Sequence, residues 1–387
     1  MSDGSTRNLP FGKPIIGEEE RNAVMDVLRG PQLVHGPRAE RFEADFAAFV
    51  GGGRALSVAS CTAGLHLAYV YLGIGRGDEV IVPAQTHVAT AHAVEYTGAK
   101  PVFVDVVAET GNIDIDQIEA AIGPGTRAIC VVHYLGLPVD MDRVNALARK
   151  HDLFVVEDCA LSIGGRYKGV HTGLLGDVGA FSFYPVKHIT TAEGGIFLSR
   201  RPEITEQVQK IKSFGYDKPL GERVVPGLYD VNRLGYNYRM NEMEAALGIE
   251  QLKRVPGFLR KRRENDAVLR HELADIREIS LLGAGGGDYE HANYCMGVVL
   301  SEAISSRRFD ILASLRNAGV GTSVYYPGPV PHLTYYKEKY GWGAVPFPNA
   351  TRISDQSIAL SVGPHLDGDD MCYIAAALKS AIKGALS

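Results

Sequence analysis

A single lysine in the stretch FSFYPVKHITTAEGG (181–195) stands where it could do chemistry. Lys187 follows an apolar aromatic strand and precedes a Gly-Gly turn. Burial disfavours the charged ammonium and lowers the pKa of a lysine, and the neutral amine is the form that condenses with an aldehyde. Since most lysines near strand ends extend into solvent, Lys187 alone would not predict a reactive group.

The stretch VVEDCALSIGG (155–165) adds an acid to this lysine. It is typical of a buried strand that ends in Glu157 and Asp158, and ligands bind at the carboxyl ends of parallel strands. Pyridoxal phosphate (PLP) needs a lysine for its aldehyde and an acid against its pyridine nitrogen, which keeps the ring able to accept electrons. We therefore expect Lys187 to hold PLP as a Schiff base, with Asp158 at the ring nitrogen.

Two strand-to-helix turns are candidates for further cofactor contacts. In SVASCTAGLHL (57–67), Thr62 and Ala63 open a helix whose free N–H groups and dipole would attract a phosphate, although a plain helix cap is the commoner use of such a turn. In VPAQTHVATAHAV (82–94), His87 stands at a helix start, where its flat ring could lie over a cofactor or act as a cap.

Two tyrosine-rich stretches are candidates for substrate contacts. In RLGYNYRMNEMEAALG (233–248), Arg239 could hold a carboxylate or phosphate with two hydrogen bonds, or pack under the neighbouring tyrosines. In GTSVYYPGPVPHLTYY (321–336), Tyr326 and His332 lie on a proline-rich loop that suits either a sugar-binding wall or simple packing.

Composition excludes several classes of protein. The chain has 387 residues, of which 45% are hydrophobic and 22% charged, and its net charge is −5, which argues against a nucleic-acid surface. No apolar run is long enough to span a membrane, and the first residues lack a signal core, so we expect a cytoplasmic protein. The five cysteines are scattered, and neither they nor the histidines show metal-ligand spacing.

Short apolar runs alternate with helical stretches over the first half of the chain. The runs predict strands at 55–59, 79–83, 101–104, 128–132 and 153–156, with helices at 62–72, 86–97, 115–121 and 142–150 between them. This rhythm predicts a mainly parallel sheet with helices on both faces. Asn241 and Glu244 are spaced as a capping box, and Pro256 is expected to end that helix. We expect an arm and large cofactor-binding domain over 1–255 and a small C-terminal α+β domain over 256–387.

Taken in this order, the motifs resemble the DegT/StrS family of PLP-dependent sugar aminotransferases. The resemblance runs from PFGKPIIGEEE (10–20) to FPNATRISDQSIALSVGPHL (347–366). It implies a fold-type-I α/β enzyme and a homodimer with shared active sites. It also implies amino transfer from L-glutamate to a keto sugar, most commonly a nucleotide-linked 4-keto-6-deoxyhexose. The aminosugar product would enter a surface glycan, such as a lipopolysaccharide O-antigen, or a glycosylated metabolite.

The resemblance also implies roles for single residues. Lys187 and Asp158 keep the roles given above, and His87 occupies the position of the ring-stacking aromatic. The remaining cofactor contacts are with the phosphate, through Thr62, Ala63, Ser182 and, from the neighbouring subunit, Asn237. The candidates for substrate contacts are Arg239, Tyr326, His332 and His188.

Three departures from the family pattern bear on the chemistry. Leu161 stands where many members have a glutamine near the ring hydroxyl of PLP, and Cys61 and Gly64 replace the commoner Gly and Ala of the phosphate turn. A branch of the family carries histidine in place of the Schiff-base lysine and dehydrates sugars, so Lys187 favours transamination. A 3-keto sugar nucleotide, a keto-octulosonate acid, a dehydratase or lyase reaction and a non-catalytic regulatory protein stay open as alternatives.

Overall fold

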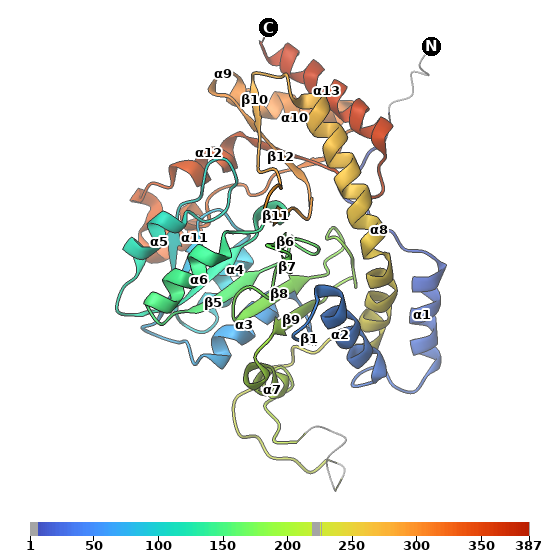
Figure 1. The fold of residues 1–387 in the computed structure, drawn as a ribbon, viewed down its shortest axis with the longest axis vertical. Coiled ribbons are helices and arrows are strands. Elements are labelled where there is room, and N and C mark those ends of the chain that lie inside the picture. Colours follow the sequence, from blue (N-terminus) through green and yellow to red (C-terminus); the bar gives the residue numbers. More distant parts are fainter. Residues whose placement is uncertain (1–6, 219–224, 226, 387) are drawn as a thin grey trace.

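A seven-stranded sheet forms the centre of the larger part of the molecule (Figure 1). The computed structural model describes residues 7–218, 225 and 227–386. The strand order is β1-β9-β8-β5-β4-β2-β3. Strands β8, β5, β4, β2 and β3 run parallel, and β9 is antiparallel to both its neighbours. The strands are β1 (Arg54–Val58), β2 (Glu79–Pro83), β3 (Lys100–Val104), β4 (Thr126–Val132), β5 (Phe154–Asp158), β8 (Val178–Ser182) and β9 (Gly195–Ser199).

Apolar side chains on both faces of this sheet explain why helices cover it twice. Along β4, Ala128 and Cys130 belong to the cluster that includes the helices α3 and α4, whereas Ile129 and Val131 pack with α5 and α6 on the opposite face. The predicted mainly parallel sheet with helices on both faces is therefore confirmed. The helices of this part are α1 (Glu18–Arg29), α2 (Pro37–Val50), α3 (Cys61–Tyr71), α4 (Val88–Glu95), α5 (Ile115–Ala121), η1 (Tyr134–Gly136), α6 (Met141–Lys150) and α7 (Pro202–Ile211).

A smaller antiparallel sheet, in the order β10-β12-β14-β13, packs against helices α8, α10 and α13. Its strands are β10 (Ile279–Leu281), β12 (Met296–Leu300), β13 (Thr322–Ser323) and β14 (Ser357–Leu360). A third, short sheet contains β6 (Arg166–Tyr167), β7 (Val170–His171) and β11 (Tyr289–Glu290). The helices of this part are α8 (Glu242–Leu273), α9 (Glu302–Ser305), α10 (Arg308–Asn317), η3 (Val330–His332), α11 (Thr334–Tyr340), η4 (Trp342–Ala344), α12 (Pro348–Gln356) and α13 (Gly368–Leu386).

One long helix, α8, joins the two parts (Figure 1). Its capping box is present as predicted, since Asn241 Oδ1 accepts the N–H of Glu244 and the Glu244 carboxylate accepts the N–H of Asn241. The expected break at Pro256 is wrong, because α8 continues through that residue to Leu273. A proline inside a helix removes one hydrogen bond at about 3 kcal/mol. Burial of residues on either side of it, Val255 and Leu259 among them, offsets that loss.

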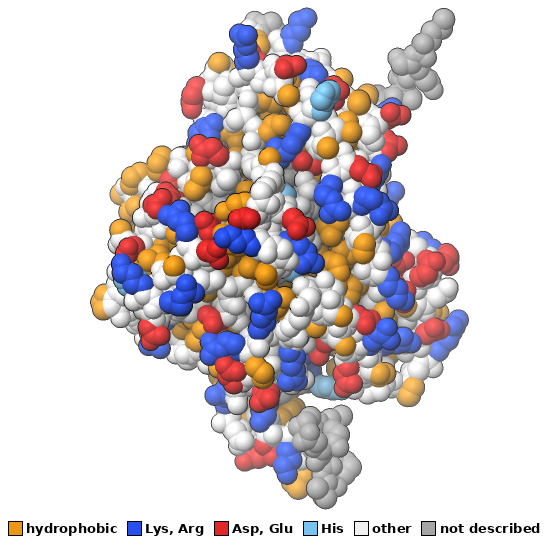
Figure 2. Space-filling view, viewed as in Figure 1, with side chains coloured by type: hydrophobic (Ala, Val, Ile, Leu, Met, Phe, Trp, Pro, Cys, Tyr) orange, Lys and Arg blue, Asp and Glu red, His pale blue; other side chains and the backbone are white. Residues whose placement is uncertain are grey.

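The surface shows no segregation of charge on the face seen in Figure 2, where Lys, Arg, Asp and Glu side chains are interspersed. Among the described residues, no helix is both long and apolar enough to cross a membrane.

Candidate active site

A pocket of about 260 Å³ lies at the carboxyl ends of β5 and β8 and contains the predicted lysine and acid together. Asp158 is the last residue of β5, and Lys187 follows β8 after a short turn. Neighbouring parallel strands end at the same edge of a sheet, and so residues 29 positions apart in the chain (187 − 158) meet there. The pocket unites six of the predicted site residues: Thr62, His87, Asp158, Ser182, Lys187 and Tyr326.

The carboxylate of Asp158 is buried and held from two sides. Thr90 Oγ1 on α4 donates to Oδ2 at 2.7 Å, and the N–H of Ala160 donates to Oδ1 at 3.1 Å. Thr86 supports Thr90, since their hydroxyl oxygens are 2.7 Å apart. A carboxylate accepts about four hydrogen bonds, so Asp158 keeps capacity for an N–H donor from the pocket.

Lys187 is half-buried, with its Nζ 5.3 Å from the centroid of the Tyr294 ring. Burial lowers the pKa of this amine, and the negative charge of Asp158 partly opposes the shift. The neutral amine is therefore more accessible near physiological pH than on an exposed lysine, as nucleophilic and general-base chemistry requires.

The first turn of α3 reaches the pocket through Cys61 and Thr62. Ser60 caps the helix, because its Oγ accepts the N–H of Ala63 at 3.1 Å. The Ala63 amide thus already has a partner and Ala63 does not line the pocket, which leaves Thr62 as the better placed of the two predicted phosphate contacts. Ser182, the last residue of β8, also lines the pocket.

Aromatic rings form one wall of the pocket. His87 is the N-cap of α4, where its Nδ1 accepts the N–H of Ala89 at 3.2 Å. Its ring contacts the ring of Tyr326 edge-on at a centroid distance of 5.6 Å. Desolvation, and then the nearby charge of Lys187, lower the pKa of His87 and favour its neutral form. His87 therefore caps helix α4 and also lines the pocket, so the two roles considered from the sequence do not exclude each other.

Two predicted substrate residues do not line this pocket. The His188 ring is buried, and its Nε2 donates to the carbonyl of Ala292 at 2.9 Å. Arg239 borders a different cavity of about 200 Å³, where it lies 4.9 Å from the centroid of the Phe214 ring. These positions do not support direct contacts of either side chain with a substrate beside Lys187 in the same subunit, and Arg239 packs on Phe214 instead of under the neighbouring tyrosines.

Asn237 and His332 lie outside the pocket as well. Asn237 is exposed and pairs with Ser213 in an isolated bridge, so its predicted contact with a neighbouring subunit's phosphate stays a prediction. The half-buried ring of His332 donates from Nε2 to the carbonyl of Val345 at 2.9 Å, which leaves its Nδ1 as an acceptor. Its contact with a sugar nucleotide likewise stays a prediction.

Sequence reasoning missed Thr90 and Tyr294. Thr90 follows Thr86 at the four-residue spacing that puts two hydroxyls on one helix face, a signal that could have been read. Tyr294 comes from the segment before β12, and no local pattern connects it with Lys187. The Cys61 thiol in the pocket has its pKa raised, mainly by burial and then by Asp158, which disfavours the thiolate that a nucleophilic cysteine needs.

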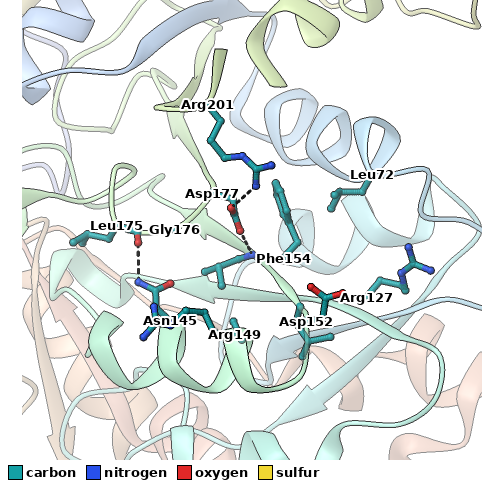
Figure 3. Close-up of a pocket in the computed structure, with 13 residues that line it drawn as sticks. Leu72, Arg127, Asn145, Arg149, Asp152, Phe154, Leu175, Gly176, Asp177 and Arg201 are labelled. Carbon is teal, nitrogen blue, oxygen red and sulfur yellow. Dashed lines mark hydrogen bonds and ion pairs between the residues drawn. The ribbon is translucent and has the colours of Figure 1, made fainter. Parts of the chain in front are cut away.

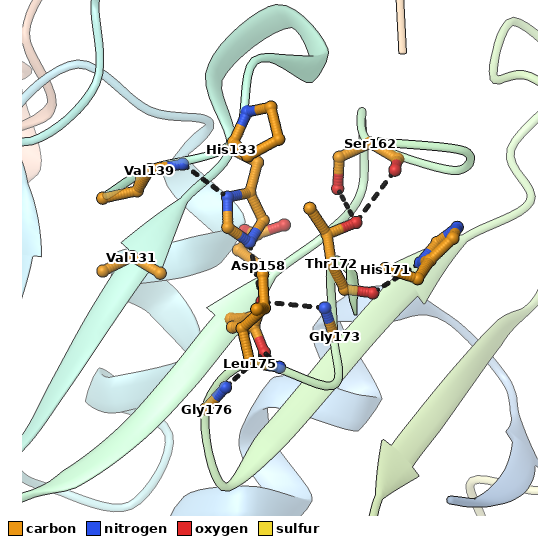
Figure 4. A network of polar contacts seen from close by, with 12 residues as sticks. Val131, His133, Val139, Asp158, Ser162, His171, Thr172, Gly173, Leu175 and Gly176 are labelled. Atoms are coloured by element: carbon orange, nitrogen blue, oxygen red, sulfur yellow. Dashed lines mark hydrogen bonds and ion pairs between the residues drawn. The ribbon is translucent and has the colours of Figure 1, made fainter. Parts of the chain in front are cut away.

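His133, Glu157 and Cys159 form a buried group with the residue types of a metal site. Figure 4 shows His133 opposite the loop that carries Gly173, Leu175 and Gly176. The carboxylate of Glu157 already accepts four donors: His133 Nε2 and the backbone N–H groups of Gly173, Leu175 and Gly176, at 2.7–2.8 Å. His133 Nδ1 accepts the N–H of Val139. Because these groups are satisfied by the protein, the cluster ties the 171–176 loop to β5 and is not a metal site.

A larger groove of about 560 Å³ lies at the opposite, amino end of β5 (Figure 3). Phe154 borders it and lies four residue steps of about 3.3 Å from Asp158, so these two residues are roughly 13 Å apart along the strand. Arg201 pairs with Asp177 and Asn145 donates to the carbonyl of Leu175, and none of the residues predicted for the site lines this groove. The catalytic candidates are therefore confined to the carboxyl end of the sheet.

Comparisons with known proteins agree with this site. The sequence model of the DegT/DnrJ/EryC1/StrS aminotransferase family matches residues 14–379. The chain is 37% identical over 383 residues to the spore coat polysaccharide biosynthesis protein SpsC of Bacillus subtilis, covering 97% of this chain and 98% of SpsC.

Two solved structures share the whole architecture. PseC of Helicobacter pylori, an aminotransferase involved in the biosynthesis of pseudoaminic acid, superposes with a TM-score of 0.91 at 27% identity, over 98% of this chain and 100% of PseC. DesV of S. venezuelae, solved in complex with a ketimine intermediate, superposes with a TM-score of 0.86 at 33% identity, over 94% of each chain.

Proposed function

This chain belongs to the DegT/DnrJ/EryC1/StrS aminotransferase family, whose members are PLP-dependent enzymes of fold type I. We propose that it transfers an amino group from L-glutamate to a keto sugar, and that a nucleotide-linked 4-keto-6-deoxyhexose is the acceptor. The observation that carries the proposal is the pairing of Lys187 and Asp158 in one pocket, with the pKa of the lysine lowered by burial.

The residues of the pocket fit PLP. Asp158 offers a fixed carboxylate with spare acceptor capacity, Thr62 and Ser182 offer polar groups beside a helix N-terminus, and His87 offers a flat ring. When bound, PLP supplies an aromatic ring that withdraws electrons from the substrate carbon next to the amine. Leu161 also lines the pocket and is buried, and its side chain has no donor for the ring hydroxyl.

Lys187 carries the proton transfers in this proposal. Its amine would act as general base toward the α-carbon of glutamate and then as general acid, and bound PLP would supply the electron sink for this transfer. In the second half of the reaction Lys187 moves a proton in the opposite direction and leaves the new amine on the sugar. Asp158, whose carboxylate is fixed by hydrogen bonds from Thr90 and Ala160, would face the pyridine nitrogen.

The relatives support a sugar as the amino acceptor. SpsC takes its name from spore coat polysaccharide biosynthesis, and a structural neighbour from Streptococcus pneumoniae, Spr1654, carries the name of a sugar aminotransferase. The edge-on His87–Tyr326 pair gives the pocket an aromatic wall of the kind that binds sugar rings. We extend the proposal to a cytoplasmic homodimer in which Asn237 reaches the neighbouring pocket, as its exposed position permits.

The test is a half-reaction with purified enzyme. Addition of L-glutamate should convert the cofactor absorbance and release one 2-oxoglutarate per site, and a panel of keto sugars should then restore it. Lys187→Ala should lose at least about 10³-fold in either half-reaction, and borohydride should no longer attach a pyridoxyl group to the chain. Retention of turnover in that variant would refute the assignment, and water release without glutamate consumption would point to the dehydratase alternative.

A further inference from the structure

Gln85 is a fully buried side chain that the proposed chemistry does not use. It lies in the turn between β2 and α4, two residues before His87. Its Nε2 donates to the carbonyl of Tyr325 at 2.8 Å and to the hydroxyl of Tyr134 at 3.2 Å, and its Oε1 accepts from Ser354 Oγ at 2.8 Å. The amide therefore uses both donors and one acceptor, and each of its partners lies on a different segment of the chain.

These bonds join both parts of the molecule at one backbone group. Gln85 and Tyr134 belong to the part built on the large sheet, whereas Tyr325 belongs to the loop after β13 in the smaller part. The Tyr134 hydroxyl also donates to the Tyr325 carbonyl, which thus accepts two hydrogen bonds from the opposite part. The Tyr325 side chain is fixed separately, its hydroxyl lying 2.7 Å from that of Tyr294.

The residue that follows this pinned carbonyl is Tyr326, which lines the pocket beside Lys187 and His87. The peptide plane that carries the Tyr325 carbonyl also carries the nitrogen and Cα of Tyr326, so hydrogen bonds to this oxygen fix the backbone position from which the Tyr326 ring projects. A shift of about 1 Å in a substrate-positioning group can reduce the rate 10²-fold.

We propose that Gln85 is a positioning residue for Tyr326: through the Tyr325 carbonyl it holds the Tyr326 ring on the wall of the pocket where the keto sugar binds. The inference rests on the proposed function, because it requires Tyr326 to contact the sugar. Gln85 itself does not line the pocket and touches neither the cofactor nor the substrate. Gln85 should therefore affect the rate of the keto-sugar half-reaction. The glutamate half-reaction depends on Lys187 and Asp158 and should not require Gln85.

Gln85→Met tests the inference in the full-length holoenzyme, because methionine keeps the shape but donates no hydrogen bond. We expect kcat/KM for the keto-sugar half-reaction to fall about 10–100-fold, while the glutamate half-reaction stays within about threefold. Tyr134→Phe removes the second donor to the same carbonyl. Like Gln85→Met, it should lower kcat/KM for the keto-sugar half-reaction and leave the glutamate half-reaction nearly unchanged. Ser354→Ala is the matched control: it removes only the bond to Oε1, and both half-reactions should stay within about threefold of the wild type.

A double-mutant cycle separates positioning from general stability. If Gln85 acts through Tyr326, Gln85→Met should add less than about twofold to the defect of Tyr326→Ala, and crystals of Gln85→Met should show the Tyr326 ring moved from His87. Additive defects, equal losses in both half-reactions, or an unmoved ring would overturn the inference, and Tyr134→Phe supplies the same cycle should Gln85→Met fail to fold. If Tyr326→Ala alone leaves the sugar half-reaction unchanged, the proposed sugar contact fails instead, whatever Gln85 does.

Discussion

At the scale of single residues, the proposed chemistry depends on a lysine whose pKa is lowered by burial and on a carboxylate fixed beside it by hydrogen bonds. Burial lowers the pKa of Lys187, with Asp158 opposing the shift, whereas the Glu95 carboxylate holds the pKa of Lys339 above its usual value. The pKa of Lys187 thus lies below, and that of Lys339 above, the value of about 10.4 for an ordinary lysine.

Competitive acetylation of the apoprotein over a range of pH should show this difference directly. A lowered pKa means that Lys187 loses its proton at a lower pH than an exposed lysine does. The acetylation rate of Lys187 should therefore reach its plateau at a lower pH than that of exposed lysines. The rate of Lys339, whose pKa is raised, should reach its plateau at the highest pH. In Asp158→Asn the opposing charge is removed, so the Lys187 curve should move to still lower pH. A Lys187 curve that coincides with those of exposed lysines would contradict the desolvated amine.

Thr90 offers a second test at this scale, because it touches the acid and lies beyond the reacting atoms. Thr90→Val keeps the shape and removes the hydrogen bond to Asp158 Oδ2. Hydrogen bonds to charged groups contribute about 1.5–3 kcal/mol, so kcat/KM should fall about 10–100-fold in both half-reactions. Thr97→Val on the same segment, whose hydroxyl bonds only to the Val94 carbonyl and the Ala99 N–H, is the control and should leave both rates unchanged.

At the scale of elements, helix α8 fixes the two parts of the molecule to each other, and two of its glycines differ in what surrounds them. A Cβ on Gly248 would lie 2.7 Å from Cζ of the buried Phe42 ring of α2, whereas the nearest atom to a Cβ on Gly257 is Arg260 Nη2 at 3.9 Å. The contact with α2 therefore requires glycine at one position and not at the other.

Gly248→Ala should lower the free energy of unfolding by about 1–3 kcal/mol despite the better helix propensity of alanine, because the core at Phe42 is overpacked. Gly257→Ala should be neutral or should stabilise by up to about 1 kcal/mol. Urea denaturation of the two variants measures both values. Equal effects of the same sign would mean that the α2–α8 contact does not depend on the missing Cβ.

At the scale of the whole molecule, the pocket is expected to be completed by a second copy of the chain. Asn237 is exposed and does not line the pocket of its own subunit, which is consistent with a contact across a dimer interface. This arrangement predicts that two different inactive subunits can restore one intact site between them.

Lys187→Ala and Asn237→Ala chains, each impaired alone, should complement each other when refolded together. A mixed dimer has one site with both defects and one site with neither, so random pairing should recover about a quarter of the wild-type activity. No recovery in dimers shown by light scattering to be mixed would place Asn237 in the site of its own subunit. A monomer at working concentration would refute the shared site.

Local sequence patterns determined much of this protein. Alternating apolar runs predicted the parallel sheet, because burial on both faces needs continuous apolar strands, and the two motifs around Asp158 and Lys187 met as expected, because neighbouring parallel strands end at one edge. The capping box of α8 could also be predicted from the sequence, because both of its hydrogen bonds join residues within one helical turn.

Only the tertiary structure decided the rest, because it depends on contacts between segments far apart in the chain. Burial on both sides of Pro256 keeps α8 continuous where the local rule predicts an end. His188 points into the interior although it adjoins Lys187, and Tyr294 lies by the amine although nothing near it in sequence marks it. The proposed role of Gln85 depends on a hydrogen bond to the carbonyl of Tyr325, 240 residues away in the chain. No spacing within a strand or helix predicts such a bond.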